Sequence, residues 1–136
     1  MVNLIVGKKG SGKTKAMLDN VALALNNENG DIVFINHGDR HIYHLNHSIR
    51  LIDIEEFGIN TFSEFKSFIN GALSQNYDIT HIFIDSLFKV VPEGHEALAE
   101  FVNDLGKISD EYAVDFTITI SADKSELPEA VYEYIA

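Results

Sequence analysis

Cysteine is absent from the 136-residue chain, and arginine and proline each occur only twice. The absence of cysteine excludes disulfide bonds, thiolate metal sites and cysteine nucleophiles. No apolar run approaches the ~20 residues needed to span a bilayer. The first residues also lack the basic region of a signal peptide. Together these absences predict a cytoplasmic protein without membrane insertion.

Positive charge is scarce as well: the chain has 10 lysines and arginines against 21 aspartates and glutamates, so its formal net charge is −11. The first 15 residues nevertheless carry four lysines and no acid, whereas the segment from Glu93 onward carries eleven acids against two lysines. An acidic surface of this kind repels polyanions, so it disfavours broad nucleic-acid binding. The exception is a small basic region near the N-terminus, which could still hold an anion.

Apolar residues make up 46% of the chain, enough to bury a core, and the length suits one domain covering residues 1–136. Strand-type and helix-type segments alternate along it. The expected strands are 3–6, 31–36, 49–54, 79–85 and 116–120. The expected helices are 13–27, one after a Thr61/Glu64 capping box, 95–112, and a short final helix opened by Pro128. This alternation predicts an α/β fold, a three-layer sandwich with a mostly parallel five-stranded sheet.

The segment between the first expected strand and the first expected helix carries the strongest motif. It reads Gly7-Lys8-Lys9-Gly10-Ser11-Gly12-Lys13-Thr14 and matches G-x-x-x-x-G-K-[ST] at every fixed position. Glycines allow successive N–H groups to turn toward a phosphate, and the following helix adds its positive dipole end. The motif therefore predicts a nucleotide-binding loop over residues 7–14. Lys13 is expected on the β- and γ-phosphates and the Thr14 hydroxyl on Mg²⁺. Lys8 and Lys9, at variable positions, either steer the anion or offset the acidic remainder.

An acidic residue ends the strand expected at 79–85, where Ile82-Phe83-Ile84 precedes Asp85. Ligands of open α/β sheets bind outside the carboxyl ends of the strands. We therefore expect Asp85 to lie near the phosphate loop and to hold Mg²⁺ together with Thr14, directly or through a water. The plainer interpretation of Asp85 is a helix cap or a loop residue.

Together the two motifs resemble the P-loop NTPases, and their arrangement is similar to the RecA-like and AAA-type branch. The chain also looks like short stand-alone bacterial ATP-binding proteins. In that branch an additional strand separates the strand of the phosphate loop from the strand of the acidic motif. The resemblance implies that segment 116–120 fills this gap, with the central strand order 31–36, 79–85, 116–120, 3–6. It also implies that Ser121 or Thr119, near the tip of the additional strand, contacts the γ-phosphate.

The chain departs from this branch at the glutamate that often polarises the attacking water. Ser86 occupies the position after Asp85 where that glutamate often stands. Other members carry it at a neighbouring strand end, where this chain offers Asn36, Asp39, Glu55 or Glu56. The resemblance therefore supports nucleotide binding more strongly than hydrolysis.

Two functional hypotheses follow. The first is an ATP-binding protein with Mg²⁺-dependent hydrolysis that is slow or stimulated by a partner, with Lys13, Asp85 and Ser121 as candidate catalytic residues. The second is a non-catalytic switch or regulatory subunit, in which ATP or ADP controls docking to a protein partner or to a second copy. A small-molecule kinase is disfavoured, because no arginine-bearing lid or acceptor site is recognisable. Arg40 is expected in a surface ion pair, with an arginine finger toward a neighbouring subunit as the alternative.

Four histidines are concentrated after the second expected strand: His37, His41, His44 and His47. On a helix several of them would share one face and could bind a metal ion. No cysteine accompanies them, and the flanking residues supply no further ligands. A solvated connector is therefore the favoured interpretation.

Overall fold

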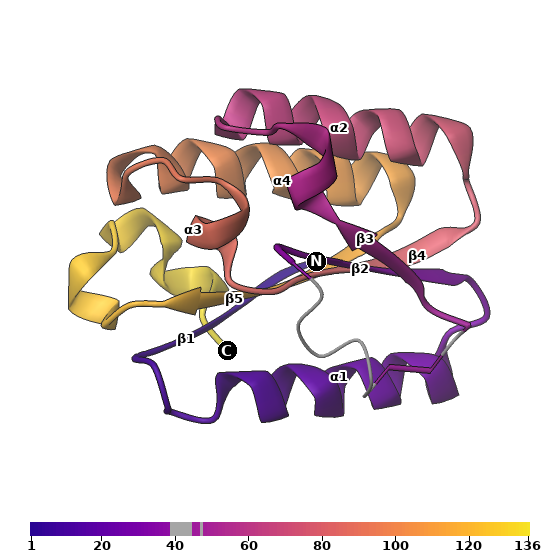
Figure 1. Cartoon of the computed structure of the whole chain (residues 1–136), viewed down its shortest axis with the longest axis horizontal. Helices are drawn as coiled ribbons and strands as arrows, with labels where there is room; N and C mark the ends of the chain where they lie inside the picture. The colour runs from indigo at the N-terminus through magenta and orange to yellow at the C-terminus, as the bar shows by residue number, and fades with distance from the viewer. Residues whose placement is uncertain (39–44, 47) are drawn as a thin grey trace.

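A five-stranded parallel sheet runs through the centre of the chain (Figure 1). The computed structural model describes residues 1–38, 45–46 and 48–136. The strands are β1 (Val2–Gly7), β2 (Asp31–Asn36), β3 (Arg50–Asp53), β4 (Ile79–Ile84) and β5 (Asp115–Ser121). Their order is β1-β5-β4-β2-β3, and every neighbouring pair is parallel. The expected α/β class is confirmed, and the sheet is entirely rather than mostly parallel.

Helices cover both faces of the sheet, so the chain forms three layers (Figure 1). One face packs against α1 (Lys13–Asn27), and the other lies beneath α2 (Phe62–Gln75) and α4 (Leu98–Tyr112). The central strand β2 carries an uninterrupted apolar run, Ile32-Val33-Phe34-Ile35, because both of its faces are buried. Phe34 and Phe83 pack in the α1 cluster, while Val33 and Ile82 belong to the cluster on the opposite face.

The helices form where apolar residues recur at the three- to four-residue spacing of one helix face. Met17, Val21 and Ala24 make up the buried stripe of α1 at helical spacing. Burial of a large side chain such as Met17 stabilises the fold by roughly 1.5–3 kcal/mol. The capping box expected before α2 is confirmed: the Glu64 N–H donates to Thr61 Oγ1, and the Thr61 N–H donates to Glu64 Oε1, each at 3.1 Å.

Some boundaries differ from those expected. The helix expected at 95–112 begins with a 3₁₀ turn, His95–Ala97, and becomes α-helical only at Leu98. The short final helix expected after Pro128 is present as a 3₁₀ helix, Glu129–Tyr134, with Pro128 at its N-cap. It is brief because the chain then returns to β1, where the Ala136 N–H donates to the Leu4 carbonyl at 2.9 Å. The short helix α3 (Leu87–Val90) was not expected from the sequence.

The strand order places the two motif-bearing strands as the resemblance implied. β5 lies between β1, which precedes the phosphate loop, and β4, which precedes Asp85. In a parallel sheet all carboxyl ends meet at one edge, so both motifs lie on the same side. Within the described ranges, no helix combines the length and apolar character that crossing a bilayer requires.

Candidate functional site

Residues 7–14, the expected phosphate loop, form a tight turn between β1 and α1. Gly12 precedes the first residue of α1 with φ 89°, and Gly10 has φ 85°. Both values lie in the left-handed region, where a Cβ is strained, so glycine is required at these two positions. The turn brings the start of α1 directly beside the end of β1.

Lys13 folds back over this turn. Its Nζ donates to the main-chain oxygen of Lys8 at 3.0 Å, and the Ser11 N–H donates to the same oxygen at 3.1 Å. The start of α1 has no side-chain cap. Among the described residues, no main-chain carbonyl accepts from the N–H groups of Gly12, Lys13 or Thr14. The positive end of α1 therefore retains the donors that an anion would use.

Asp85 lies directly after β4 and is only 3% exposed. The Thr119 hydroxyl on β5 donates to Asp85 Oδ1 at 2.8 Å and accepts from the Ser86 N–H at 2.7 Å. Ser86 itself has φ 57°, in the left-handed region. A hydroxyl carries a single proton, and Thr119 uses it in the hydrogen bond to Asp85. Asp85 Oδ1 is therefore an acceptor held in a fixed position.

The two motifs line one depression of about 660 Å³. Its wall consists of Lys9, Gly10, Gly12, Lys13, Thr14, Asp85, Ser86, Lys89, Thr119 and Ser121. The size is in the range of small-molecule sites, roughly 300–1,000 Å³. Most of the candidate site residues are thus brought together. Ser121 is exposed at the end of β5, in register with Gly7.

Three candidates of the loop do not line the depression. Gly7 lies at the base of the loop, where its carbonyl accepts from the Ala122 N–H at 3.1 Å. The Lys8 ammonium turns toward Asp123, 3.8 Å away, and Ser11 is exposed. The pKa of Asp123 lies below its usual value because its carboxylate accepts from the Ser125 backbone and hydroxyl and lies beside Lys8.

Three lysines and one acid face the depression, in a chain with a large excess of acid. Lys9 and Lys89 form no ion pair with any other described residue. Lys89 was not among the candidates from the sequence. Its helix, α3, has four residues and is too short to show a periodic pattern. The local charge therefore favours a ligand with several negative charges.

Of the alternative residues expected to polarise water, the three that the structure describes are not brought to this depression. Asn36 is buried at the end of β2, and Glu55 and Glu56 are exposed beyond the edge strand β3. None of these three lines the depression. Asp39 lies outside the described residues, as do Arg40, His41, His44 and His47, so their expected roles stay predictions. His37, the described member of the histidine group, is exposed.

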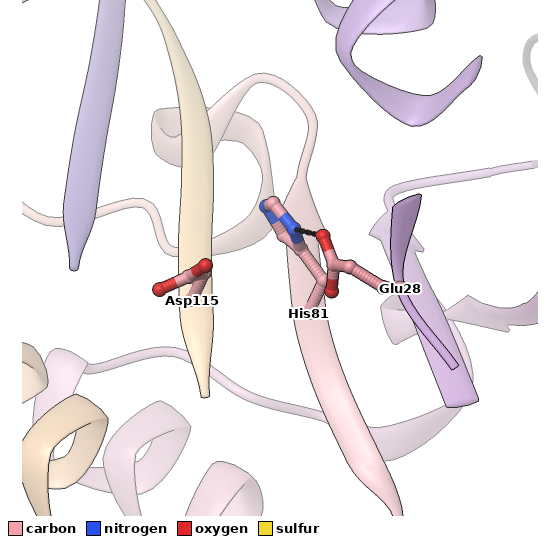
Figure 2. A group of neighbouring side chains, drawn as sticks. All are labelled: Glu28, His81 and Asp115. Atoms are coloured by element: carbon pink, nitrogen blue, oxygen red, sulfur yellow. Dashed lines mark hydrogen bonds and ion pairs between the residues drawn. The ribbon is translucent and has the colours of Figure 1, made fainter. Parts of the chain in front are cut away.

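A second group of polar side chains lies at the opposite edge of the sheet (Figure 2). Glu28 follows α1, His81 lies on β4, and Asp115 opens β5. One potential ligand atom from each lies within 4.8 Å of the other two. Sequence spacing did not reveal this group. The one available signal was a histidine within the otherwise largely apolar strand Ile79–Ile84.

The sequence matches no known family model, and no curated protein matches it. The residues that line the depression, and their chemistry, are therefore the basis on which a function can be proposed.

Proposed function

We propose that this chain is a P-loop nucleotide-binding protein that holds ATP with Mg²⁺ on residues 7–14 and hydrolyses it slowly or when a partner stimulates it. One observation carries the proposal: Lys13, Thr14 and Asp85 line one depression. These groups come from two motifs that are far apart in the sequence. A glycine-rich turn that served only to connect β1 with α1 would not require a buried aspartate on the same depression.

The phosphates are bound by the loop and by the start of α1. The Lys13 ammonium, which donates to the Lys8 carbonyl at 3.0 Å, is already close to the loop backbone. A phosphate oxygen is a stronger acceptor for an ammonium than a neutral carbonyl, because both partners are then charged. The N–H groups of Gly12, Lys13 and Thr14 supply further donors at the positive end of the helix.

The donor set also fits Mg²⁺. This ion prefers oxygen ligands, takes one or two carboxylates from the protein, and keeps waters and phosphate oxygens around it. Thr14 and Asp85 offer a hydroxyl and a carboxylate on the same depression. Thr119 holds the Asp85 carboxylate in place through the 2.8 Å hydrogen bond. When bound, Mg²⁺ would neutralise charge that develops on the β- and γ-phosphates.

Hydrolysis requires in-line attack by water, and here positioning and charge supply most of the rate. Ser121 offers a hydroxyl at the end of β5, and Lys9 and Lys89 offer positive charge across the depression. Asp85 is the one carboxylate among the described residues of the lining, and it is assigned to the metal. Without a second carboxylate to orient water, the expected intrinsic rate is low.

Mg²⁺-dependent phosphate release from ATP tests the enzymatic proposal. We expect slow release by the wild type and none by Lys13→Ala. Lys107→Ala is the matched control, because Lys107 is an exposed lysine on α4 and does not line the depression. Equal release by wild type and Lys13→Ala would contradict the proposal.

A non-catalytic switch is the second candidate function. It is favoured by the lack of a glutamate on the described lining of the depression. In this case ATP and ADP bind, but they change the association with a protein partner or with a second copy. Sedimentation of the protein with ATP, with ADP and without nucleotide tests it: a change in mass supports a switch, and identical profiles argue against self-association. A small-molecule kinase is less supported, since the described lining contains no arginine.

A further inference from the structure

His81 is held in a fixed orientation at the edge of the sheet opposite the phosphate loop (Figure 2). The residue is 9% exposed, and its ring stacks on Phe83, with 4.1 Å between centroids and 6° between planes. Nε2 lies 2.8 Å from Thr117 Oγ1, and Nδ1 lies 2.9 Å from Glu28 Oε2. Metal-ligating histidines are held in this manner, with one nitrogen fixed by an outer partner and the other facing the ion.

Two carboxylates approach this one imidazole. Glu28 reaches it from the end of α1, and Asp115 comes from the neighbouring strand β5. The Thr117 hydroxyl can donate or accept, so both tautomers of His81 fit these contacts. In the tautomer whose Nε2 donates to Thr117, the lone pair of Nδ1 faces the Glu28 carboxylate, and a cation between them stabilises that form. The Asp115 carboxylate is half exposed and pairs with the Met1 amine at 3.0 Å, and that amine also contacts Ser109. An exposed pair of this kind is weak and is readily exchanged.

The end of α1 favours a cation for a separate reason. The carboxyl end of a helix carries the negative end of its dipole, which basic side chains commonly compensate. The last turn of α1 contains no basic residue. Negative charge therefore surrounds the buried imidazole, from the helix end and from the carboxylates of Glu28 and Asp115. The chain has few lysines and arginines that could balance this charge.

We propose that Glu28, His81 and Asp115 form a binding site for a divalent transition-metal ion of the zinc type. The inference does not depend on the proposed nucleotide function. Imidazole and carboxylate ligands suit such ions at about 2.0–2.2 Å, and three protein ligands leave a fourth position for water. Tetrahedral coordination requires ligand atoms about 3.3 Å apart. The 2.9 Å between Nδ1 and Oε2 needs to open by a few tenths of an ångström, and the remaining separations, up to 4.8 Å, need to close as the half-exposed Asp115 side chain moves toward the ion.

The bound ion has a structural consequence. It ties the carboxyl end of α1 to β4 and β5, while the other end of the same helix carries the phosphate loop. Neither Glu28 nor Asp115 lines the depression described above. The two sites are therefore chemically separate, and substitutions at one can be made without removing ligands from the other.

Zinc titration of the full chain without a histidine tag, after removal of metal by a chelator, tests the site. Isothermal calorimetry and elemental analysis are expected to give one Zn²⁺ per chain. Glu28→Gln and Asp115→Asn, which keep size and remove charge, should each weaken zinc binding at least tenfold. Thr117→Val should weaken it about 10- to 100-fold, because outer partners of ligating histidines have effects of this size. Circular dichroism checks that each variant is folded.

Three controls make the result decisive. Glu96→Gln removes an exposed acid elsewhere, and Thr14→Ala removes the expected Mg²⁺ ligand; both should leave zinc binding unchanged. The triple variant His41→Ala/His44→Ala/His47→Ala should also retain it, which separates this site from the histidine-rich connector. Absence of zinc binding, unchanged affinity in folded Glu28→Gln and Asp115→Asn, or loss of binding in the triple variant would overturn the proposal.

Discussion

Thr119 positions Asp85 through a single hydroxyl that donates to the carboxylate Oδ1 at 2.8 Å and accepts from the Ser86 N–H at 2.7 Å. The hydroxyl thereby links β5 to the end of β4, inside the gap between the two motif-bearing strands. Both Thr119 and Asp85 are buried, so water does not readily replace a lost bond. The geometry of the proposed metal ligand therefore depends on the neighbouring strand.

Thr119→Val should affect both stability and nucleotide binding. The change removes the hydroxyl from its hydrogen bonds with the Asp85 carboxylate and the Ser86 N–H, which costs about 1–3 kcal/mol of unfolding free energy. We also expect Mg²⁺ to enhance ATP binding less than in the wild type. Denaturant unfolding and nucleotide titration with and without Mg²⁺ measure the two effects.

Thr117→Val is the matched control for this substitution. Thr117 is a buried threonine on the same strand, but it contacts His81 at the opposite edge of the sheet. This variant should lose stability while keeping the full Mg²⁺ dependence of ATP binding. If the two variants respond to Mg²⁺ identically, Thr119 has no special part in holding Asp85.

Lys89→Ala should weaken binding of ATP more than binding of ADP. Lys89 faces the depression from α3 without an ion pair to another described residue, so its charge is available to a terminal phosphate. We expect a loss of about 3- to 10-fold in ATP affinity at low salt, shrinking as salt screens the charge. Titration of ATP and ADP at two ionic strengths checks this, with Lys107→Ala as the control. An equal loss for both nucleotides would remove Lys89 from contact with the γ-phosphate.

Gly12→Ala should damage the phosphate loop locally. At φ 89° a Cβ is strained, which costs about 1–2 kcal/mol. The strain also tilts the N–H groups away from their positions, so nucleotide affinity should fall.

Gly71→Ala is the opposite case, because Gly71 lies within α2 with open space around its Cβ position. That variant should gain about 0.5–1 kcal/mol and bind nucleotide normally. Thermal melts with and without ATP compare the two. Normal ATP binding by Gly12→Ala would show that the loop tolerates a side chain and would argue against a tight phosphate cup.

The sequence contained much of the fold because the strongest signals are local. The apolar run Ile32-Val33-Phe34-Ile35 reveals a strand buried on both faces, and the stripe through Met17 and Val21 reveals a helix. The motif that predicts a phosphate loop is visible in the sequence because its glycines and lysine lie within eight consecutive residues. The strand order followed from the resemblance rather than from the spacing of residues.

The remaining features depend on contacts between distant segments. His81 and Asp115 become neighbours only through the register of β4 with β5, and Glu28 joins them from the end of α1. Lys89 reaches the depression because the short helix α3 turns back after Ser86. The left-handed backbone of Ser86 could not be predicted from any sequence pattern. Ser121 could be predicted only as one of two polar residues near the tip of β5.

A thermal melt of the wild type and Lys13→Ala with Mg²⁺ and ATP tests the central claim most directly. ATP at 100 times its Kd adds about 2.7 kcal/mol of stability. At roughly 2–4 °C per kcal/mol, the wild-type Tm should rise by about 5–10 °C. Lys13→Ala should melt near the wild-type temperature without ligand and show little or no shift with ATP. An unchanged wild-type Tm with ATP and with ADP, or an equal rise in Lys13→Ala, would contradict nucleotide binding at residues 7–14.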